Sequence, residues 1–331
     1  MALVAAVVVA GPLLDAAGQS YWLVSLTRAL LLSVLAVSTN LAWGVTGIFT
    51  LGQAVFFGFG AYAAGLLATK SGVTSLLVLA GAAGAAGVIA GLVIGAFLFF
   101  GRRRVGELYV GLVTLALTYA LERLATVWDV IGAANGIPGV PLPTLLGTEI
   151  ETGLPFFWVA LVALVATFAL GAWLLRSQFA LVMRAVRDDD ERAEFLGYRR
   201  PQVQLAVFTV VSGIGAIAGA LYAVEEGFVS PSFLGVALST QVLVYILLGG
   251  RGTLVGPALG VLLLEVGGQR IQESLPSEWP IIVGAMLLLV IMFLPGGVMD
   301  LRSLGRTLRR PAVQPTSTMR PEVAGADPHG E

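Results

Sequence analysis

Several residue types on which catalytic and redox sites depend are missing from the sequence or almost missing. Cysteine is absent, which excludes disulfides, thiolate zinc sites and cysteine nucleophiles. The one histidine, His329, lies close to the end of the sequence, so the body of the chain has neither a Ser-His-Asp triad nor an HExxH zinc helix. The one lysine, Lys70, has Thr69 and Ala64 where a phosphate-binding P-loop needs glycines. This chain therefore does not hydrolyse ATP through a P-loop, and we expect neither an enzyme nor a cofactor or metal site.

Charged residues are also scarce. They make up 12% of the 331 residues, whereas a soluble domain carries about 25%. Hydrophobic residues supply 57% of the chain. This composition excludes a large soluble enzyme with a conventional surface and is typical of a chain embedded in a lipid bilayer. No nucleic-acid partner is expected.

Long apolar segments follow one another along most of the chain. A helix of about 20 apolar residues crosses the hydrocarbon core of a bilayer. Two of the segments are short and interrupted by glycines, so they are candidates for broken or re-entrant helices that other protein must cover. We therefore predict an all-α polytopic membrane protein with about ten transmembrane helices. The segments lie near residues 2–14, 21–44, 52–69, 73–100, 107–127, 154–175, 203–224, 234–249, 252–267 and 281–297.

Arginine is distributed unevenly between the connecting loops. Fifteen of the 19 basic residues lie in loops 101–106 and 176–202, in the turn 250–252 and in the tail from residue 302. The alternate loops hold a single arginine, Arg270, and seven acidic residues. Because cytoplasmic loops carry an excess of arginine and lysine, the first set is predicted to be cytoplasmic. Ten spans then place both termini in the cytoplasm.

The chain has no second folded domain in this interpretation. Residues 1–302 form one membrane domain, with residues 176–202 as its main cytoplasmic loop. Residues 303–331 are polar and rich in proline, without an apolar period, so we expect a disordered cytoplasmic tail.

The loop 176–202 contains the signals of a short helix. Asp188 can cap its start, and Glu191 follows three residues later in capping-box position. Gly197 suits the left-handed position after the last turn. We interpret the loop as an element that docks into a partner subunit, and the alternative is a solvated amphipathic turn on the membrane surface. The residues assigned to docking are Arg184, Arg187, Asp188, Glu191, Arg192, Phe195, Leu196 and Gly197.

Polar residues within the apolar segments are few and are candidates for a solute pathway, although each can equally serve a hydrogen bond between helices. Glycines at four-residue spacing, such as Gly87, Gly91 and Gly95, indicate close helix packing within one bundle or, alternatively, a subunit interface. The candidate pathway residues are Asn40, Gln53, Thr114, Thr118 and Gln241. The candidate docking residues of the outer loops are Asn135, Gly136, Pro138, Glu225, Glu226, Ser230 and Pro231.

Four stretches in order resemble one known family. They are NLAWGVTGIFTLGQAVFFGFGAYAAG at residues 40–65, YVGLVTLAL followed by NGIPGVP within 109–141, RAVRDDDERAEFLG at 184–197, and GALYAVEEGFVSPSFLGVALSTQVLVYILLGGRGTLVGPALG at 219–260. The chain is similar to the membrane permease subunits of ABC importers for branched-chain amino acids, in particular the LivM-like group. The third stretch is similar to the coupling helix that meets the ATPase in such importers.

This resemblance implies a non-catalytic half of an ATP-driven importer in a bacterial or archaeal inner membrane. The implied partners are a second homologous permease, two cytoplasmic ABC ATPase subunits and an extracytoplasmic substrate-binding protein. Because relatives with the same fold import urea or short amides, a urea or short-amide importer is the first alternative. A stand-alone secondary transporter of a small neutral solute is the second, although no ion-coupling site is evident in the sequence.

Overall fold

The part of the chain that the computed structural model describes, residues 2–45, 47–101, 106–145, 147–188, 190–293 and 297, is built almost entirely of α-helices. The side chains of a few residues within it, Asp188 and Glu191 among them, are not described. The predicted disordered tail, residues 303–331, and the arginines of loop 101–106 lie outside this part. The α-helices are α1 (Ala2–Ala16), α2 (Ser20–Asn40), α3 (Gln53–Ser71), α4 (Leu76–Phe99), α5 (Glu107–Val127), α6 (Leu154–Arg176), α7 (Gln178–Asp188), α8 (Asp190–Phe195), α9 (Arg200–Glu226), α10 (Val236–Gly249), α11 (Gly256–Val261), α12 (Gln269–Ser274) and α13 (Trp279–Phe293).

Short irregular elements connect or extend these helices. Two are π-helices, η1 (Leu41–Val45) after α2 and η5 (Leu262–Val266) after α11. Three are 3-10 helices, namely η2 (Asp129–Ile131), η3 (Ala133–Asn135) and η4 (Pro231–Leu234). Four two-residue strands form two small antiparallel pairs, β1 (Ile137–Pro138) with β4 (Phe228–Val229), and β2 (Thr144–Leu145) with β3 (Thr148–Glu149).

The all-α prediction is confirmed, and each of the ten predicted segments overlaps at least one helix of the described residues. By length and composition, five helices of the described residues suffice to cross a bilayer. Shorter apolar helices occupy Leu3–Ala16, Val236–Gly249 and Ile281–Val290. The five long helices are Ser20–Gly44, Leu76–Phe99, Leu108–Val127, Leu154–Arg176 and Arg200–Glu226.

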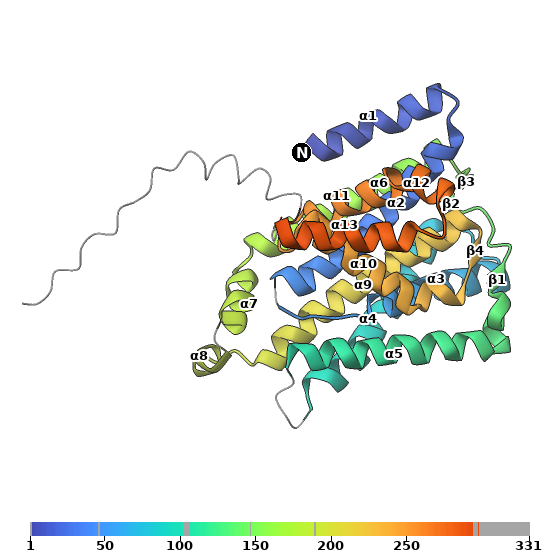
Figure 1. Ribbon diagram of the computed structural model, residues 1–331. Coiled ribbons are helices and arrows are strands. Elements are labelled where there is room, and N and C mark those ends of the chain that lie inside the picture. The colour runs from blue at the N-terminus through green and yellow to red at the C-terminus, as the bar shows by residue number, and fades with distance from the viewer. Residues whose placement is uncertain are drawn as a thin grey trace, which may run out of the picture.

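The connecting elements gather at two opposite ends of the bundle. Figure 1 places α7 and α8 at one end and the strands β1 and β4 at the other. The antiparallel pairing aligns Ile137 with Val229 and joins the two loops that the sequence assigns to the outer side. The loop rich in arginine and the acidic loops are therefore separated by the length of the helices.

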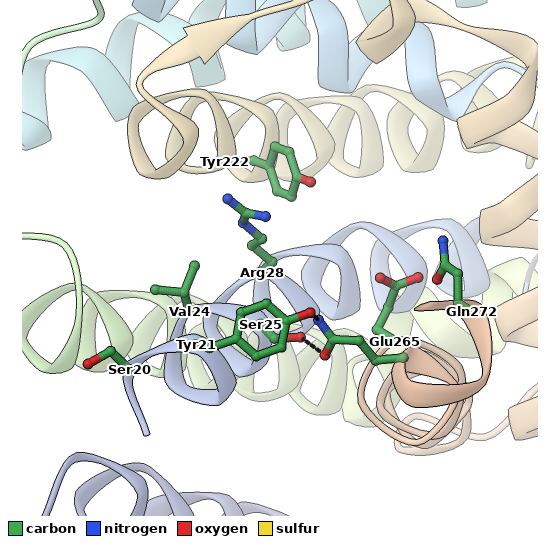
Figure 2. Close-up of a pocket in the computed structure, with 9 residues that line it drawn as sticks. Ser20, Tyr21, Val24, Ser25, Arg28, Tyr222, Glu265 and Gln272 are labelled. Carbon is green, nitrogen blue, oxygen red and sulfur yellow. Dashed lines mark hydrogen bonds between the residues drawn. The ribbon is translucent and has the colours of Figure 1, made fainter. Parts of the chain in front are cut away.

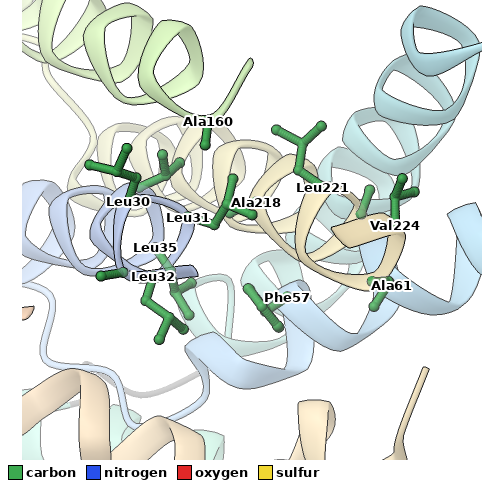
Figure 3. Close-up of a cluster of buried hydrophobic side chains, with 14 of the residues drawn as sticks. Leu30, Leu31, Leu32, Leu35, Phe57, Ala61, Ala160, Ala218, Leu221 and Val224 are labelled. Carbon is green, nitrogen blue, oxygen red and sulfur yellow. The ribbon is translucent and has the colours of Figure 1, made fainter. Parts of the chain in front are cut away.

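Helices α2 and α9 form the centre of the bundle. Leu31 and Leu35 of α2 are fully buried, and Figure 3 shows them in a cluster with Ala218 of α9 and Phe57 of α3. A helix that is apolar all round is stable only where its whole surface is covered by protein or lipid. The outer helices accordingly expose large apolar side chains such as Phe97 of α4, as a lipid-facing surface requires.

The glycine ladders hold helices of this bundle together. A Cβ atom at Gly91 of α4 would lie 2.7 Å from the Ser212 Cβ of α9. A Cβ at Gly219 of α9 would lie 1.8 Å from the backbone oxygen of Phe57 in α3. Only glycine permits these backbone approaches, so the predicted close packing within one bundle is confirmed.

The two short apolar segments form a hairpin of α10 and α11. A Cβ at Gly249 would lie 1.8 Å from the Gly256 oxygen, and one at Gly260 would lie 2.1 Å from the Tyr245 oxygen. Helix α10 has 14 residues and α11 has six, so each is shorter than the ~20 residues of a full span. The turn between α10 and α11 packs against the end of α2, where Asn40 bonds backbone groups of the turn. Other protein therefore covers this polar backbone, as we expected for a broken or re-entrant segment.

Candidate functional site

The predicted docking loop folds as two helices rather than one. Helix α7 buries Ala180, Met183 and Val186 along one side, at the three-residue spacing of a helix face. These side chains join a cluster that includes Val203 and Val207 of α9. The element is thus packed on the protein, and not only laid on a membrane surface.

The start of the docking helix was predicted incorrectly and its end correctly. Asp188 is the last residue of α7, whereas α8 begins at Asp190, so Asp188 is not the cap of the short helix. After Phe195 the chain turns at Gly197, whose φ is +89°. The Gly197 amide donates to the Glu194 oxygen at 2.9 Å, and the Tyr198 amide donates to the Ala193 oxygen at 3.0 Å. These two bonds form a Schellman ending, which glycine permits because it lacks a Cβ.

The tip of α8 carries two apolar side chains that the rest of the described chain leaves uncovered. Phe195 is 92% exposed and Leu196 is 74% exposed, whereas the neighbouring Ala193 is 1% exposed. Behind the tip, Arg187 of α7 donates from Nη1 to the Gly44 oxygen at 3.0 Å. Arg184 and Arg192 are exposed near the same end. We call α7, α8 and Leu196–Gly197 the docking element.

An unwound segment, residues 47–52, separates η1 from α3 and lies inside the bundle. The Leu51 amide donates to Thr114 Oγ1 of α5 at 3.1 Å, and the Ala54 amide donates to Ser239 Oγ of α10 at 3.3 Å. Neighbouring helices thus satisfy backbone groups that the missing helical turn leaves free. Helix α3 therefore begins inside the bundle, next to Thr114 of α5, and not at its surface.

Gln53, the first residue of α3, is the most unusual of the predicted pathway residues. It is 1% exposed, and neither its Oε1 nor its Nε2 has a hydrogen-bond partner among the described residues. A buried amide without partners costs about 1–3 kcal/mol, so its presence calls for a functional explanation. Gln53 also lies at the N-terminus of α3, where the helix dipole places a partial positive charge.

Three other predicted pathway residues have structural partners. Asn40 donates from Nδ2 to the Thr253 oxygen at 2.8 Å, and its Oδ1 accepts from the Gly252 amide at 3.0 Å. Thr118 Oγ1 donates to the Thr114 oxygen of its own helix at 2.7 Å. Thr114 does the same within α5 and also accepts from the unwound segment. Asn40, Thr114 and Thr118 thus fit the alternative to a pathway role, because their polar groups make hydrogen bonds within the bundle.

A polar cavity of about 500 Å³ lies at the opposite end from the docking element, between α2, α9, η5 and α12. We call it the outer pocket and define it by Tyr21, Val24, Arg28, Tyr222, Glu265 and Gln269. Figure 2 shows Arg28 of α2 pointing toward Tyr222 of α9, with Glu265 on a neighbouring helix.

Two charged side chains of the outer pocket have defined partners. Arg28 contacts Glu226 through two nitrogens, Nε at 2.9 Å from Oε1 and Nη2 at 3.0 Å from Oε2. Of these two contacts only the one from Nη2 is a hydrogen bond, and the Nε contact is an ion pair without hydrogen-bond geometry. Glu265 accepts from Gln241 Nε2 at 2.9 Å and from the Tyr245 hydroxyl, both on Oε1. Gln241, a predicted pathway residue, therefore lies beside this pocket.

Hydrogen bonds also order the floor of the outer pocket. Gln269 of α12 accepts from Ser25 Oγ at 2.6 Å and donates from Nε2 to the Tyr21 hydroxyl at 2.6 Å. Tyr21 in turn donates to Glu273. None of these residues was among the sequence candidates. A charged residue within an apolar span, as Arg28 is, is the signal that could have identified the pocket.

The predicted outer docking residues divide into two groups. Asn135 and Pro138 are exposed near the β1–β4 pair. Glu225 is 6% exposed and its carboxylate oxygens have no hydrogen-bond partner among the described residues, while Glu226 is held by Arg28. The two glutamates therefore face the bundle and not the outer surface, because the last turn of α9 directs them inward.

The remaining predicted outer residues, Gly136, Ser230 and Pro231, determine the conformation of the connection between α9 and α10. Gly136 is buried with φ +67°, and a Cβ there would lie 2.1 Å from the Val229 oxygen. Ser230 Oγ accepts from the Ser232 amide at 3.3 Å and so caps η4. Pro231 is buried at the start of η4. These three positions fix the loop that joins α9 to α10.

An almost entirely helical body with five helices long and apolar enough to cross a bilayer, a cavity at one end and an exposed apolar tip at the other is typical of a multi-pass membrane protein. Residues 21–293 match the family described as branched-chain amino acid transport system / permease component. The chain belongs to that family.

Individual relatives agree with this assignment. The permease LivM of the high-affinity branched-chain amino acid transport system of Salmonella typhimurium is 28% identical over 302 residues, which cover 83% of this chain and 69% of the relative. A protein of Methanocaldococcus jannaschii described as a probable branched-chain amino acid transport permease, LivM, is 28% identical over 225 residues, 63% of this chain and 65% of the relative. The permease LivH of Salmonella typhimurium is 23% identical over 287 residues, 81% of this chain and 90% of the relative. No solved structure matches the chain.

Proposed function

We propose that this permease forms half of the translocation pathway of an ATP-driven importer for branched-chain amino acids. The proposal rests on the family match over residues 21–293 and on relatives described as permeases for these solutes. The other half would come from a second, homologous permease. Two cytoplasmic ATPase subunits and an extracytoplasmic binding protein complete the importer, in the inner membrane of a bacterium or an archaeon.

The docking element is proposed to bind an ATPase subunit. Its exposed pair Phe195 and Leu196 supports this proposal, because an apolar tip on a rigidly ended helix suits a pocket on a partner. The arginines Arg184, Arg187 and Arg192, together with Asp188 and Glu191, would supply polar contacts around the tip. The partner provides the energy that a chain without a P-loop lacks.

Motion of the docking element has a direct route to the interior. Arg187 of α7 bonds the Gly44 oxygen, and Gly44 lies three residues before the unwound segment 47–52 that precedes Gln53. We propose that closure of the ATPases moves α7 and thereby shifts this segment, which alters access to Gln53. A segment without regular helical bonding deforms at lower cost than a helix, so it suits this hinge role.

Ten spans with both termini in the cytoplasm remain our proposed topology. Figure 1 supports it by placing the start of α1 at the end of the bundle that carries α7 and α8. The exposed Asn135 and Pro138 at the other end, with the neighbouring Gly136 and with Ser230 and Pro231 of the adjoining α9–α10 connection, would meet the binding protein. Glu225 and Glu226 are left out of that contact because of their inward placement.

Uptake of labelled leucine by a strain that lacks its own branched-chain importers tests the function. The strain carries this chain, its second permease, the ATPases and the binding protein. We expect ATP-dependent leucine uptake that unlabelled valine reduces and urea does not. Loss of urea uptake alone on deletion of the chain would overturn the substrate assignment. Gradient-driven uptake by liposomes that contain only this chain would instead favour a secondary transporter.

A further inference from the structure

The outer pocket contains charges of both signs. Arg28 of α2 supplies a guanidinium, and Glu265 of η5 supplies a carboxylate that faces the same cavity. Charged groups inside an apolar bundle are costly and mark sites of function. Four side chains surround them with hydroxyl and amide groups, namely Ser25, Tyr21, Gln269 and Gln272.

Both charged groups keep bonding capacity for a ligand. Arg28 contacts Glu226 through Nε and Nη2, and its Nη1, which carries two N–H donors, has no hydrogen-bond partner among the described residues. The Arg28 side chain is 42% exposed and lines the cavity. Glu265 accepts two hydrogen bonds from the described residues, both on Oε1, which leaves Oε2 for a further donor.

The remaining walls are apolar. Val24 and the ring of Tyr222 line the cavity beside the charged groups. The volume of about 500 Å³ lies within the range of about 300–1,000 Å³ that is typical of small-molecule sites. A compact aliphatic side chain therefore has an apolar surface to contact next to the two charges.

We propose that the outer pocket is a relay site that binds the zwitterionic end of an amino acid. Arg28 receives the α-carboxylate and Glu265 receives the α-ammonium group, while Val24 and Tyr222 contact the side chain. This assignment rests on the proposed function and adds the residues that recognise the substrate. A permanently neutral solute such as urea does not need either charge.

The pair between Arg28 and Glu226 explains why such a site would bind weakly. Glu226 already neutralises the guanidinium, so an arriving carboxylate competes with a carboxylate of the protein. A pathway site must release its solute as readily as it accepts it. The pocket lies at the end opposite to the docking element, where a binding protein would deliver the amino acid.

Saturation-transfer NMR on the purified importer complex, without binding protein and with millimolar leucine as the probe, tests the site. Leucinamide and 4-methylpentanoate serve as probes that lack the carboxylate or the ammonium group. We expect a leucine signal that exceeds both analogues in the wild-type complex. Arg28→Gln and Glu265→Gln should each weaken leucine binding at least tenfold, which corresponds to about 1.4 kcal/mol.

Glu226→Gln separates recognition from mere structural pairing. If Arg28 binds the substrate, removing its competitor should strengthen the leucine signal, whereas a purely structural pair would make Glu226→Gln as damaging as Arg28→Gln. Glu278→Gln, on an exposed carboxylate outside the pocket, is the matched control. All variants are compared for yield and elution profile, so misfolding is recognised.

The outcomes distinguish the pocket from the proposed function. Absence of a leucine signal in the wild type, or equal signals in wild type, Arg28→Gln and Glu265→Gln, would overturn the relay site. If leucine uptake by the wild-type importer persists in that case, the import function stands and only the pocket assignment fails. If the wild type takes up no leucine, the proposed function fails as well.

Discussion

Polar residues inside the apolar helices have two different fates in this permease. Asn40 and Thr118 are bound to backbone oxygens, so their polarity is used to hold the bundle together. Gln53 is buried and its amide has no partner among the described residues, whereas Arg28 and Glu265 face a cavity. The sequence identified Asn40, Thr118 and Gln53 alike, because the type of residue does not reveal whether a partner lies opposite.

Replacing Gln53 with leucine tests its proposed role in the pathway. Because the change removes two buried polar atoms that lack partners, we expect a free energy of unfolding higher by about 1–3 kcal/mol. Transport should fall at the same time, since a polar group on the route is lost. Thermal unfolding in detergent and leucine uptake measure the two effects. Gln202→Leu, the same change at an exposed residue, should leave both unchanged. A stabilised variant with full transport would remove Gln53 from the pathway.

Local turn chemistry was predictable where it depends on one residue. Gly197 was expected to end the docking helix in the left-handed region, and its φ of +89° confirms this. Asp188 was expected to cap the same helix and instead ends α7. Where α7 ends depends on how it packs on α9, which the local sequence does not contain.

At the scale of elements, the docking element combines a buried face with an exposed tip. Met183 and Val186 of α7 fix it to the bundle, while Phe195 and Leu196 at the end of α8 extend away from it. A helix packed firmly on the bundle transmits a displacement of its exposed end to the bundle better than a flexible loop does. The element therefore fits the role of a lever between an ATPase and the helices.

Changing both Phe195 and Leu196 to serine should weaken ATPase association. Truncation of a central contact residue costs about 2 kcal/mol or more, which is about a 30-fold loss of affinity. Co-purification of the ATPase and ATP hydrolysis by the assembled complex should both fall, while membrane insertion is retained. Leu275→Ser, at an exposed leucine of the opposite end, is the control. Normal co-purification by the double variant, or by a deletion of residues 188–197, would contradict the coupling role.

The crossing of α3 and α9 depends on glycine at their closest approach. A Cβ at Gly219 would meet the Phe57 backbone oxygen at 1.8 Å, and backbone cannot move aside as a flexible side chain can. Overpacking with side chains alone destabilises a protein by about 1–3 kcal/mol, and a clash with backbone costs more because the helices must separate. We therefore expect that Gly219→Val does not yield folded permease. Size-exclusion yield after solubilisation measures this loss. Gly81→Val on α4, where nothing lies within 4 Å, should retain near-normal yield; equal yields would show that the close approach is not required.

For the whole molecule, charge distribution and helix packing agree on two distinct ends. The docking element, in the loop with six arginines, lies opposite the β1–β4 pair that joins two acidic loops. Loop arginines set orientation during insertion, whereas the strand pair forms only in the folded chain. The inward Glu225 and Glu226 show the limit of the charge argument, since it counted them as outer-loop residues.

The absence of cysteine makes the orientation directly measurable. Single cysteines introduced as Asn135→Cys and Leu196→Cys lie on exposed positions at opposite ends. A membrane-impermeant maleimide added to spheroplasts should label the first and not the second, and lysis should expose the second. Leu31→Cys, at a fully buried position, should remain unlabelled in both conditions. Labelling of Leu196→Cys in intact spheroplasts would invert the proposed topology.

The sequence by itself determined the class of this protein, the helical segments and the two chemically different ends. Apolar run length and arginine placement act through transfer into lipid, which depends on composition more than on fold. Only the tertiary structure decided which polar groups meet. Arg28 and Glu226 are 198 residues apart along the chain, and their contact exists because α2 and α9 pack together at the centre of the bundle. Long-range packing therefore created the outer pocket, and it also turned the two outer glutamates inward.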